Sequence, residues 1–185
     1  MVPDGRPLSS AVLMAHHDRR LEPHASRPHI PEYGIPDDEA GLLPWHWAQE
    51  RLDRALLYWV ATTRPDRRPH SMPTWGAWVD DAFWFEGGLA TRRARNLAAN
   101  PSAVLSVAEG AEDVVILEGT TERIEDPDRR LADRIVSGFA KYRATKGYEV
   151  DPANWRTGGL WVLRPVVGFG WSRYPDDATR WTFER

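Results

Sequence analysis

Short strand-like segments separated by tight turns fill most of the chain after residue 57, and this spacing constrains the fold more than any other feature. Aromatic and β-branched residues favour strands, and we expect them at residues 58–63, 68–79, 82–86, 103–107, 114–124, 158–169 and 179–183. Asp80-Asp81 indicates a tight hairpin between two of these strands. Strands joined by such short turns predict an antiparallel sheet that closes on itself.

Three helical segments interrupt the strands. Pro44 opens the first, at the first-turn position that proline favours, and Thr91 is a good N-cap for a short second helix that Asn100-Pro101 ends. We expect Asp126-Pro127 to cap and start the third helix. Its apolar side comprises Leu131, Ile135, Phe139 and Tyr142. The fold class is therefore mainly β with flanking helices (α+β). A Rossmann fold is excluded, since the chain lacks both Gly-x-Gly-x-x-Gly and alternating strands and helices.

Residues 1–43 differ from the rest and are interpreted as a proline-rich N-terminal arm, followed by one domain at 44–185. The arm contains six prolines: Pro3, Pro7, Pro23, Pro28, Pro31 and Pro36. Ser9–Arg20 predicts a short helix, and 24–38 an extended segment that wraps over its own domain or over a partner subunit. The arm's histidines, His16, His17, His24 and His29, fit no closed set of metal ligands. We expect no metal site.

Composition excludes several classes of function. The chain has no cysteine, which excludes thiol catalysis, disulfides and cysteine-based metal sites. The net charge of −3 gives no basic surface that would indicate a nucleic-acid partner. No apolar run is long enough to span a membrane, and the first residues lack the pattern of a secretory signal. We expect a soluble, cytoplasmic protein.

Thr91-Arg92-Arg93 is the strongest candidate for a binding element. A helix start leaves main-chain N–H groups unpaired and carries partial positive charge. It is therefore an anion site. Arg92 and Arg93 add guanidinium groups, whose paired N–H donors suit phosphate oxygens. The alternative is that the two arginines pair with acidic side chains such as Glu86 or lie in water. These residues alone leave both interpretations open.

The strand expected at 68–79 carries a second set of candidates. Its pleat places His70, Met72 and Thr74 on one side, and Pro73 and Trp75 on the other. Because proline cannot donate to a ladder, Pro73 predicts a local break where main-chain groups are free to meet a ligand. His70 has no evident carboxylate partner and is assigned a binding role. The alternative for His70 is an exposed histidine at a strand end.

Several runs in this order resemble the pyridoxamine 5'-phosphate oxidase-like split β-barrels, which include enzymes that use flavin mononucleotide (FMN) or the deazaflavin coenzyme F420. The runs are 61–66, 68–75, 83–85, 91–97, 100–101 and 114–121. The ending, Gly168-Phe169-Gly170-Trp171 with Ala178-Thr179-Arg180-Trp181, is similar to the actinobacterial deazaflavin-type branch. The resemblance covers about residues 44–185.

The resemblance implies an FMN-binding split barrel that forms a homodimer, with two cofactor sites at the subunit interface. By this likeness, Thr91, Arg92 and Arg93 match the element that holds the cofactor phosphate, with Arg93 where lysine is common. The other candidate cofactor-binding residues are His70, Met72, Pro73, Thr74, Trp75, Asn96, Trp171 and Arg180. Residues 72–75 match the segment along the ring system, and Trp171 and Arg180 match a part that reaches the partner's site.

The expected function is hydride transfer between coenzyme F420 (or FMN) and a small conjugated or heteroaromatic substrate. The catalytic residues are unassigned, because the cofactor supplies the chemistry and the sequence shows no acid–base pair. The chain ends without the arginine-rich sequence of the vitamin-oxidising members, so their activity is not expected. The alternatives are a non-catalytic protein that binds or stores flavin, F420 or haem, and a structural dimer with a vestigial pocket. Substrate and native cofactor stay open.

Overall fold

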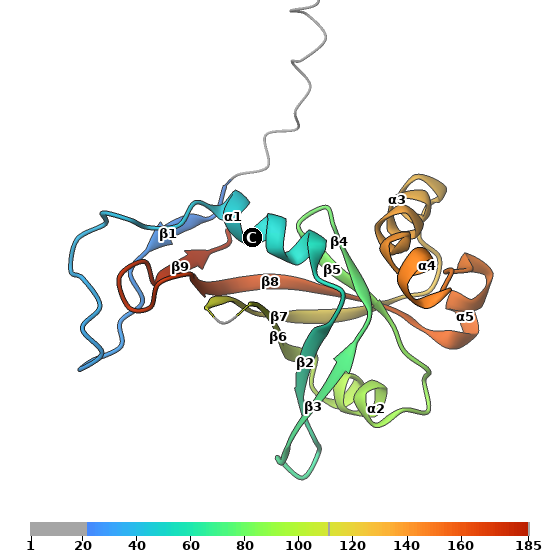
Figure 1. The fold of residues 1–185 in the computed structure, drawn as a ribbon. Helices are drawn as coiled ribbons and strands as arrows, with labels where there is room; N and C mark the ends of the chain where they lie inside the picture. The colour runs from blue at the N-terminus through green and yellow to red at the C-terminus, as the bar shows by residue number, and fades with distance from the viewer. Residues whose placement is uncertain (1–21, 111, 185) are drawn as a thin grey trace, which may run out of the picture.

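The computed structural model describes residues 22–110 and 112–184 (Figure 1). The helix predicted at Ser9–Arg20, with His16 and His17, lies outside the described residues. The strands are β1 (His24–Ser26), β2 (Tyr58–Thr63), β3 (Pro69–Thr74), β4 (Gly76–Val79), β5 (Ala82–Glu86), β6 (Ser102–Glu109), β7 (Asp113–Ile124), β8 (Leu160–Trp171) and β9 (Thr179–Thr182). The helices are α1 (Trp45–Arg54), α2 (Arg92–Ala99), α3 (Arg129–Phe139), α4 (Lys141–Lys146), the short 3₁₀ helix η1 (Pro152–Asn154) and α5 (Trp155–Gly158).

The long strand β8 organises the sheet. The described strands follow the order β1-β9-β8-β7-β6-β2-β3, and β5, which carries β4, also pairs with β8. The first half of β8 pairs with β5 and its second half with β9, while β7 runs antiparallel beside both halves. Every pairing is antiparallel. The predicted fold class, an antiparallel, mainly β split barrel with flanking helices, is confirmed.

Local chemistry explains the predicted elements that the structure reproduces. Asp80 and Asp81 both have positive φ, at 55° and 54°, as a two-residue hairpin of type I′ requires. Thr91 caps α2, since its hydroxyl accepts a hydrogen bond from the N–H of Ala94 at 3.2 Å. Both predictions are confirmed.

Two boundaries were predicted wrongly. Residues 68–79 form two strands, because the chain leaves its partner β2 at Trp75 and Gly76 begins pairing with β5. The third helix begins at Arg129, and its cap is Asp128, whose carboxylate accepts from the N–H of Leu131 at 2.9 Å. Asp126-Pro127 precedes the helix, and the apolar side predicted for it continues into α4 at Tyr142.

Two apolar clusters fill the core. The larger lies inside the coiled sheet, where α1 packs Trp45, Ala48 and Leu52 against the strands. The smaller lies between the outer side of β4, β5 and β8 and the helices after β7, and it includes Ile135, Phe139 and Tyr142. Figure 1 shows α1 above the sheet, α3 to α5 at one end, and α2 below, beside β2 and β3. The helices are thereby separated into three positions around one sheet.

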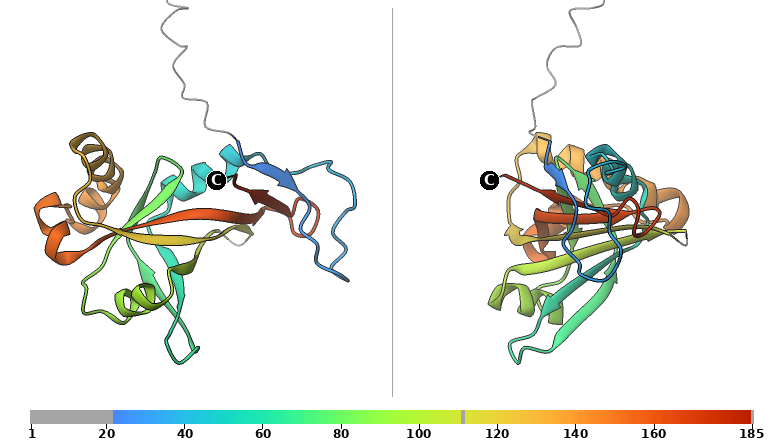
Figure 2. Two further views of the ribbon diagram at one scale, coloured as in Figure 1. Left: turned by 180° about the vertical axis from the view of Figure 1, so that it is seen from behind. Right: turned by 90° about the vertical axis from the view of Figure 1, so that its left-hand side faces the viewer.

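The described part of the N-terminal arm packs on its own chain. β1 pairs with β9, and Figure 2 shows both at the end of the sheet remote from α3 and α5. The guanidinium of Arg27 donates to the main-chain oxygens of Asp176 at 3.0 Å and Ala178 at 3.1 Å. Arg27 also bonds the oxygens of Asp38 and Ala40. Arg27 thus ties the arm to the loop before β9.

Within residues 22–110 and 112–184, no helix is both long and apolar enough to cross a membrane.

Candidate functional site

The N-terminus of α2 combines unpaired main-chain N–H groups with two adjacent arginines. The helix starts after the glycine-containing loop 87–90, and Thr91 caps it. The described contacts include no acceptor for the N–H groups of Arg92 and Arg93, which are the donors that a helix start leaves unpaired. Within the described residues, neither arginine forms an ion pair with a carboxylate. Among the described residues, no carboxylate therefore pairs with the positive charge at this helix start.

The side chains of Arg92 and Arg93 differ in how firmly the protein holds them. Arg92 is exposed. The guanidinium of Arg93 is held, because it donates to the main-chain oxygen of Glu86 at 2.8 Å and lies over the ring of Phe85 at 4.8 Å. Burial lowers the pKa of Arg93 from its ordinary value. A Cβ on Gly87 would lie 2.9 Å from this guanidinium, so the glycine leaves room for it. The alternative pairing with the Glu86 side chain is wrong, since Arg93 bonds the main chain of Glu86.

His70 and Asn96 connect this helix to the edge strand β3. Asn96 is 1% exposed and donates from Nδ2 to the hydroxyl of Thr62 at 2.9 Å. The same hydroxyl lies 3.4 Å from Nδ1 of His70, opposite Thr62 in the β2–β3 ladder. Desolvation, followed by the charges of Arg92, Arg64 and Arg93, lowers the pKa of His70. His70 thus lies within the field of the α2 cations.

The break in the edge strand lies at Trp75, two residues after Pro73. Pro73 sits within β3, opposite Trp59, at the free edge of the sheet, where a missing donor costs no ladder bond. The Tyr142 hydroxyl both accepts from the N–H of Gly76 and donates to its oxygen, each at 3.0 Å. The prediction that Pro73 marks the break is wrong in position. The main-chain N–H and oxygen of Gly76, beside the actual break, are not free, because both bond the hydroxyl of Tyr142.

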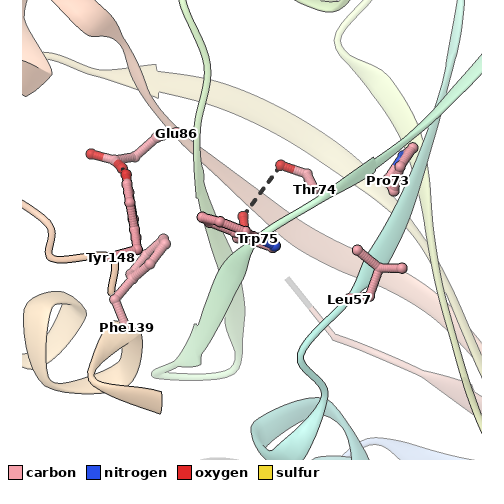
Figure 3. A pocket seen from close by; sticks show the side chains of 7 residues that line it. All are labelled: Leu57, Pro73, Thr74, Trp75, Glu86, Phe139 and Tyr148. Atoms are coloured by element: carbon pink, nitrogen blue, oxygen red, sulfur yellow. Dashed lines mark hydrogen bonds between the residues drawn. The ribbon is translucent and has the colours of Figure 1, made fainter. Parts of the chain in front are cut away.

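A cavity of ≈ 350 Å³ opens beside this break (Figure 3). Pro73, Thr74 and Trp75 line one part of it, and Leu57 lies beside them. The far wall consists of Glu86, Phe139 and Tyr148. In Figure 3 the carboxylate of Glu86 and the hydroxyl of Tyr148 point toward one another, and this hydroxyl donates to Glu86. Three predicted site residues therefore share a cavity with residues that lie far from them in sequence.

Met72 and Thr74 extend the His70 side of β3. Their partners across the ladder, Val60 and Tyr58, are buried, and Met72 is 48% exposed because β3 projects past the core. The structure thus places Thr91, Arg92, Arg93, Asn96 and His70 around the start of α2. Residues 72–75 lead from there to the cavity.

Trp171 and Arg180 lie elsewhere in the chain. Trp171 ends β8, and Arg180 is on β9, across the sheet from β3 (Figure 1). The ring of Trp171 meets Tyr174 edge-on at 5.4 Å, and the guanidinium of Arg180 donates to Thr182 at 2.9 Å. One chain does not bring these two residues together with the α2 site.

Sequence reasoning missed the residues on the far wall of the cavity. Glu86 ends β5, and its carboxylate also accepts from the indole N–H of Trp155 at 2.7 Å. Tyr148 and Trp155 follow α4 and precede β8, in a region without strand or helix periodicity that would point inward. The only available signal was an acidic residue at the end of a strand of otherwise buried aromatic residues.

A coiled antiparallel sheet with flanking helices is the architecture of the split-barrel class. The family model described as pyridoxamine 5'-phosphate oxidase matches residues 46–155, more than half of the chain. The chain therefore belongs to the pyridoxamine 5'-phosphate oxidase-like family.

Solved structures share this fold at low identity. An F420 reductase is 24% identical, with a TM-score of 0.52 over 65% of this chain and 94% of that one. An FMN-binding protein related to pyridoxamine 5'-phosphate oxidase, from Nostoc punctiforme, is 17% identical (TM-score 0.54, 75% and 89% covered). A haem-binding protein from Mycobacterium smegmatis is 20% identical (TM-score 0.55, 71% and 57% covered). No curated protein matches the sequence. At these identities the likeness extends to the fold alone.

Proposed function

We propose that this protein is an oxidoreductase that binds a phosphorylated flavin-type cofactor, F420 or FMN, and catalyses hydride transfer with a small conjugated or heteroaromatic substrate. The observation that carries the proposal is the start of α2. It presents two N–H groups and the side chain of Arg92 with no carboxylate among the described residues to neutralise them. A phosphate would supply the missing negative charge.

The residues around α2 fit such a group in their donor chemistry. Arg92 is exposed and suited to bind phosphate oxygens as a fork. Arg93, already bonded to Glu86, would contribute mainly charge and a fixed wall. His70 has a lowered pKa and is therefore uncharged at neutral pH, where it would donate or accept one hydrogen bond.

Residues 72–75 would then position the ring system between the edge strand and the cavity. When bound, the cofactor supplies the hydride chemistry. The protein orients it, through the phosphate at α2 and the strand at Met72 to Trp75, and the aromatic residues of the cavity exclude water from one side. No described side chain near the cavity is assigned as an acid or base, and the proposed reaction requires none.

We further propose that the protein acts as a homodimer whose sites combine two chains. The support is an outward face of the sheet that is apolar and partly exposed. Trp59, Ile116 and Phe169 share this face, since they belong to one row of ladder partners. Arg180 is the next partner in that row, and Trp171 has the same parity on β8 as Phe169. A second copy on this face would place its own Trp171 and Arg180 against the first chain.

Between the two cofactors, we favour F420, because the C-terminal sequence resembles the deazaflavin branch. Of the three arginines in the turn between β2 and β3, Arg64 and Arg68 could bind the acidic tail of this coenzyme. Both form ion pairs with Asp66, at 3.0 Å and 2.6 Å, so their charge is partly compensated. Arg67 has no ion pair among the described residues and is the stronger candidate of the three.

The second candidate function is a non-catalytic protein that binds or stores a flavin, F420 or haem. It is favoured by the lack of an assigned acid–base group, and a structural relative is described as haem-binding. Turnover separates the two. The purified protein is loaded with reduced F420 or reduced FMN, and cofactor absorbance is followed after adding a quinone or nitroimidazole acceptor. An enzyme oxidises the cofactor repeatedly, whereas a protein that retains the cofactor without oxidising it would contradict the proposed activity.

A further inference from the structure

Glu86 contributes a carboxylate to the wall of the aromatic cavity, and no cationic side chain of residues 22–110 and 112–184 pairs with it. Its side-chain oxygens accept from two neutral donors, the hydroxyl of Tyr148 and the indole N–H of Trp155. In the part of the chain that the structure describes, no lysine, arginine or histidine forms an ion pair with Glu86. The guanidinium of Arg93 donates to the main-chain oxygen of Glu86. The cavity therefore holds a carboxylate that has no ion-pair partner among the described side chains.

The two neutral donors fix the carboxylate without using all its acceptor capacity. Each carboxylate oxygen has two lone-pair directions, and each accepts one hydrogen bond from the protein. Burial and the Glu86 carboxylate both raise the pKa of Tyr148, so its hydroxyl remains a donor at physiological pH. The remaining lone pairs are available to a ligand.

Aromatic rings form most of the remaining wall of the cavity. Trp75 stacks on Tyr142 with centroids 5.4 Å apart and planes at 21°, which fixes the indole in the wall. Tyr148 meets Trp75 edge-on at 5.1 Å, and Phe139 lies 6.4 Å from Tyr148. Figure 3 shows the rings of Trp75, Phe139 and Tyr148 and the carboxylate of Glu86 around the same space. Electron-rich ring faces attract cations, most strongly where water is excluded.

We propose that this cavity is a binding site for a small organic cation, in which Glu86 provides the counter-charge and Trp75, Phe139 and Tyr148 provide the aromatic wall. The ligand class is an ammonium with apolar substituents, since hydrogen-bond acceptors on the wall are few and the rings are apolar. A volume of ≈ 350 Å³ is at the lower end for ligand pockets, which favours a small molecule.

The location relates the cation to the proposed cofactor. Pro73, Thr74 and Trp75 belong both to the cavity wall and to the segment 72–75 that would hold the ring system. A cation in the cavity would thus lie beside the ring, as the substrate or as part of it. This last step rests on the proposed function, whereas binding of the cation does not.

Isothermal titration of the cofactor-free full chain with choline and with 3,3-dimethylbutan-1-ol tests the proposal, because these two probes share shape and differ in charge. We expect choline to bind at least about tenfold more tightly than its neutral analogue. Glu86→Gln should abolish this preference. Glu149→Gln is the control, since Glu149 is an exposed carboxylate near Tyr148 that pairs with Arg143. Equal binding of the two probes to the wild-type protein would overturn the proposal.

A second variant guards against an effect of Glu86→Gln on folding. Leu57 lines the cavity with 48% of its surface exposed, so it tolerates polar replacement. Leu57→Arg places a cation opposite Glu86 and should weaken choline binding at least tenfold, while Leu57→Gln should not. If Leu57→Arg binds choline as the wild type does, the site is not this cavity. Cofactor affinity, measured separately, reports on the α2 site and not on Glu86.

Discussion

Asn96 shows how a single buried amide positions the candidate site. It joins α2 to β2 through Thr62, and the same hydroxyl lies next to His70 on the edge strand. A buried polar side chain keeps its place because leaving its partner unsatisfied costs more than the bond itself contributes. The position of the α2 cations relative to β3 therefore depends on this contact.

Replacing Asn96 by alanine should lower the free energy of unfolding by about 1–3 kcal/mol, because the Thr62 hydroxyl loses a buried donor. Urea unfolding followed by fluorescence measures the loss. The double variant Asn96→Leu with Thr62→Val, which removes both polar partners, should lose less than the sum of the single changes. Full additivity would show that the two side chains are not coupled.

For single residues, the sequence predicted the role of a side chain only where that role depends on neighbours close in the sequence. Thr91 was predicted as a helix cap, and Asp80-Asp81 as a hairpin, because each depends on residues a few positions away. Asn96 was named only as part of a motif, and its partner Thr62 is 34 positions away. Glu86 was considered only as a partner of the arginines, since its contacts with Tyr148 and Trp155 depend on the packed fold.

Among the elements, the change of partner after β3 was the main feature that sequence could not predict. Residues 68–79 keep strand character throughout, and only the three-dimensional sheet decides that β3 pairs with β2 while β4 pairs with β5. Gly76 permits the change, because a Cβ there would lie 2.3 Å from the ring of Phe83. The break creates the cavity wall at Trp75, so the cavity too could not be predicted.

The helix α4 carries a lysine whose burial has a measurable consequence. Lys141 donates to the main-chain oxygen of Asp53 and to the hydroxyl of Tyr58, both at 2.7 Å, and so ties α4 to the end of α1. Burial lowers the pKa of Lys141 to about 8 from 10.5. Between these two values the unfolded chain binds more protons than the folded one, so this group makes stability rise with pH.

We therefore expect the free energy of unfolding of the wild type to rise relative to that of Lys141→Met as pH increases from 7.5 to 9.5. Below about pH 7 Lys141 is protonated in both states, and the difference between the two proteins should be constant. Urea midpoints at intervals across this range provide the measurement. Parallel curves for the two proteins would contradict the lowered pKa.

For the whole molecule, the outward face of the sheet is the feature that the proposed dimer explains. Trp59 lies at the centre of this face and is 48% exposed. Its ladder row continues through Ile116 and Phe169 to Arg180. Exposed apolar surface of this kind is typical of interfaces. Family resemblance, rather than any pattern in the sequence, led to the expectation that Trp171 and Arg180 act across subunits, and this stays a prediction.

Trp59→Glu should convert the protein to a monomer, because a charge at the centre of an apolar interface would be buried without a partner. Light scattering after size-exclusion chromatography measures the mass. Leu56→Glu changes an exposed leucine that precedes β2 and should leave the mass of the dimer unchanged. A wild-type mass equal to one chain would contradict the dimer at once.

The central claim is that the start of α2 holds the phosphate of a flavin-type cofactor, and parallel titrations with F420 and FMN test it most directly. We expect the wild type to bind at least one of them, and Arg92→Ala to bind it about 10- to 100-fold more weakly, the loss for a hydrogen bond to a charged group. Arg129→Ala is the matched control, since Arg129 is an exposed arginine at the first position of α3. Its affinity should equal that of the wild type. The claim is contradicted if the wild type binds neither cofactor, or if Arg92→Ala binds as tightly as the wild type.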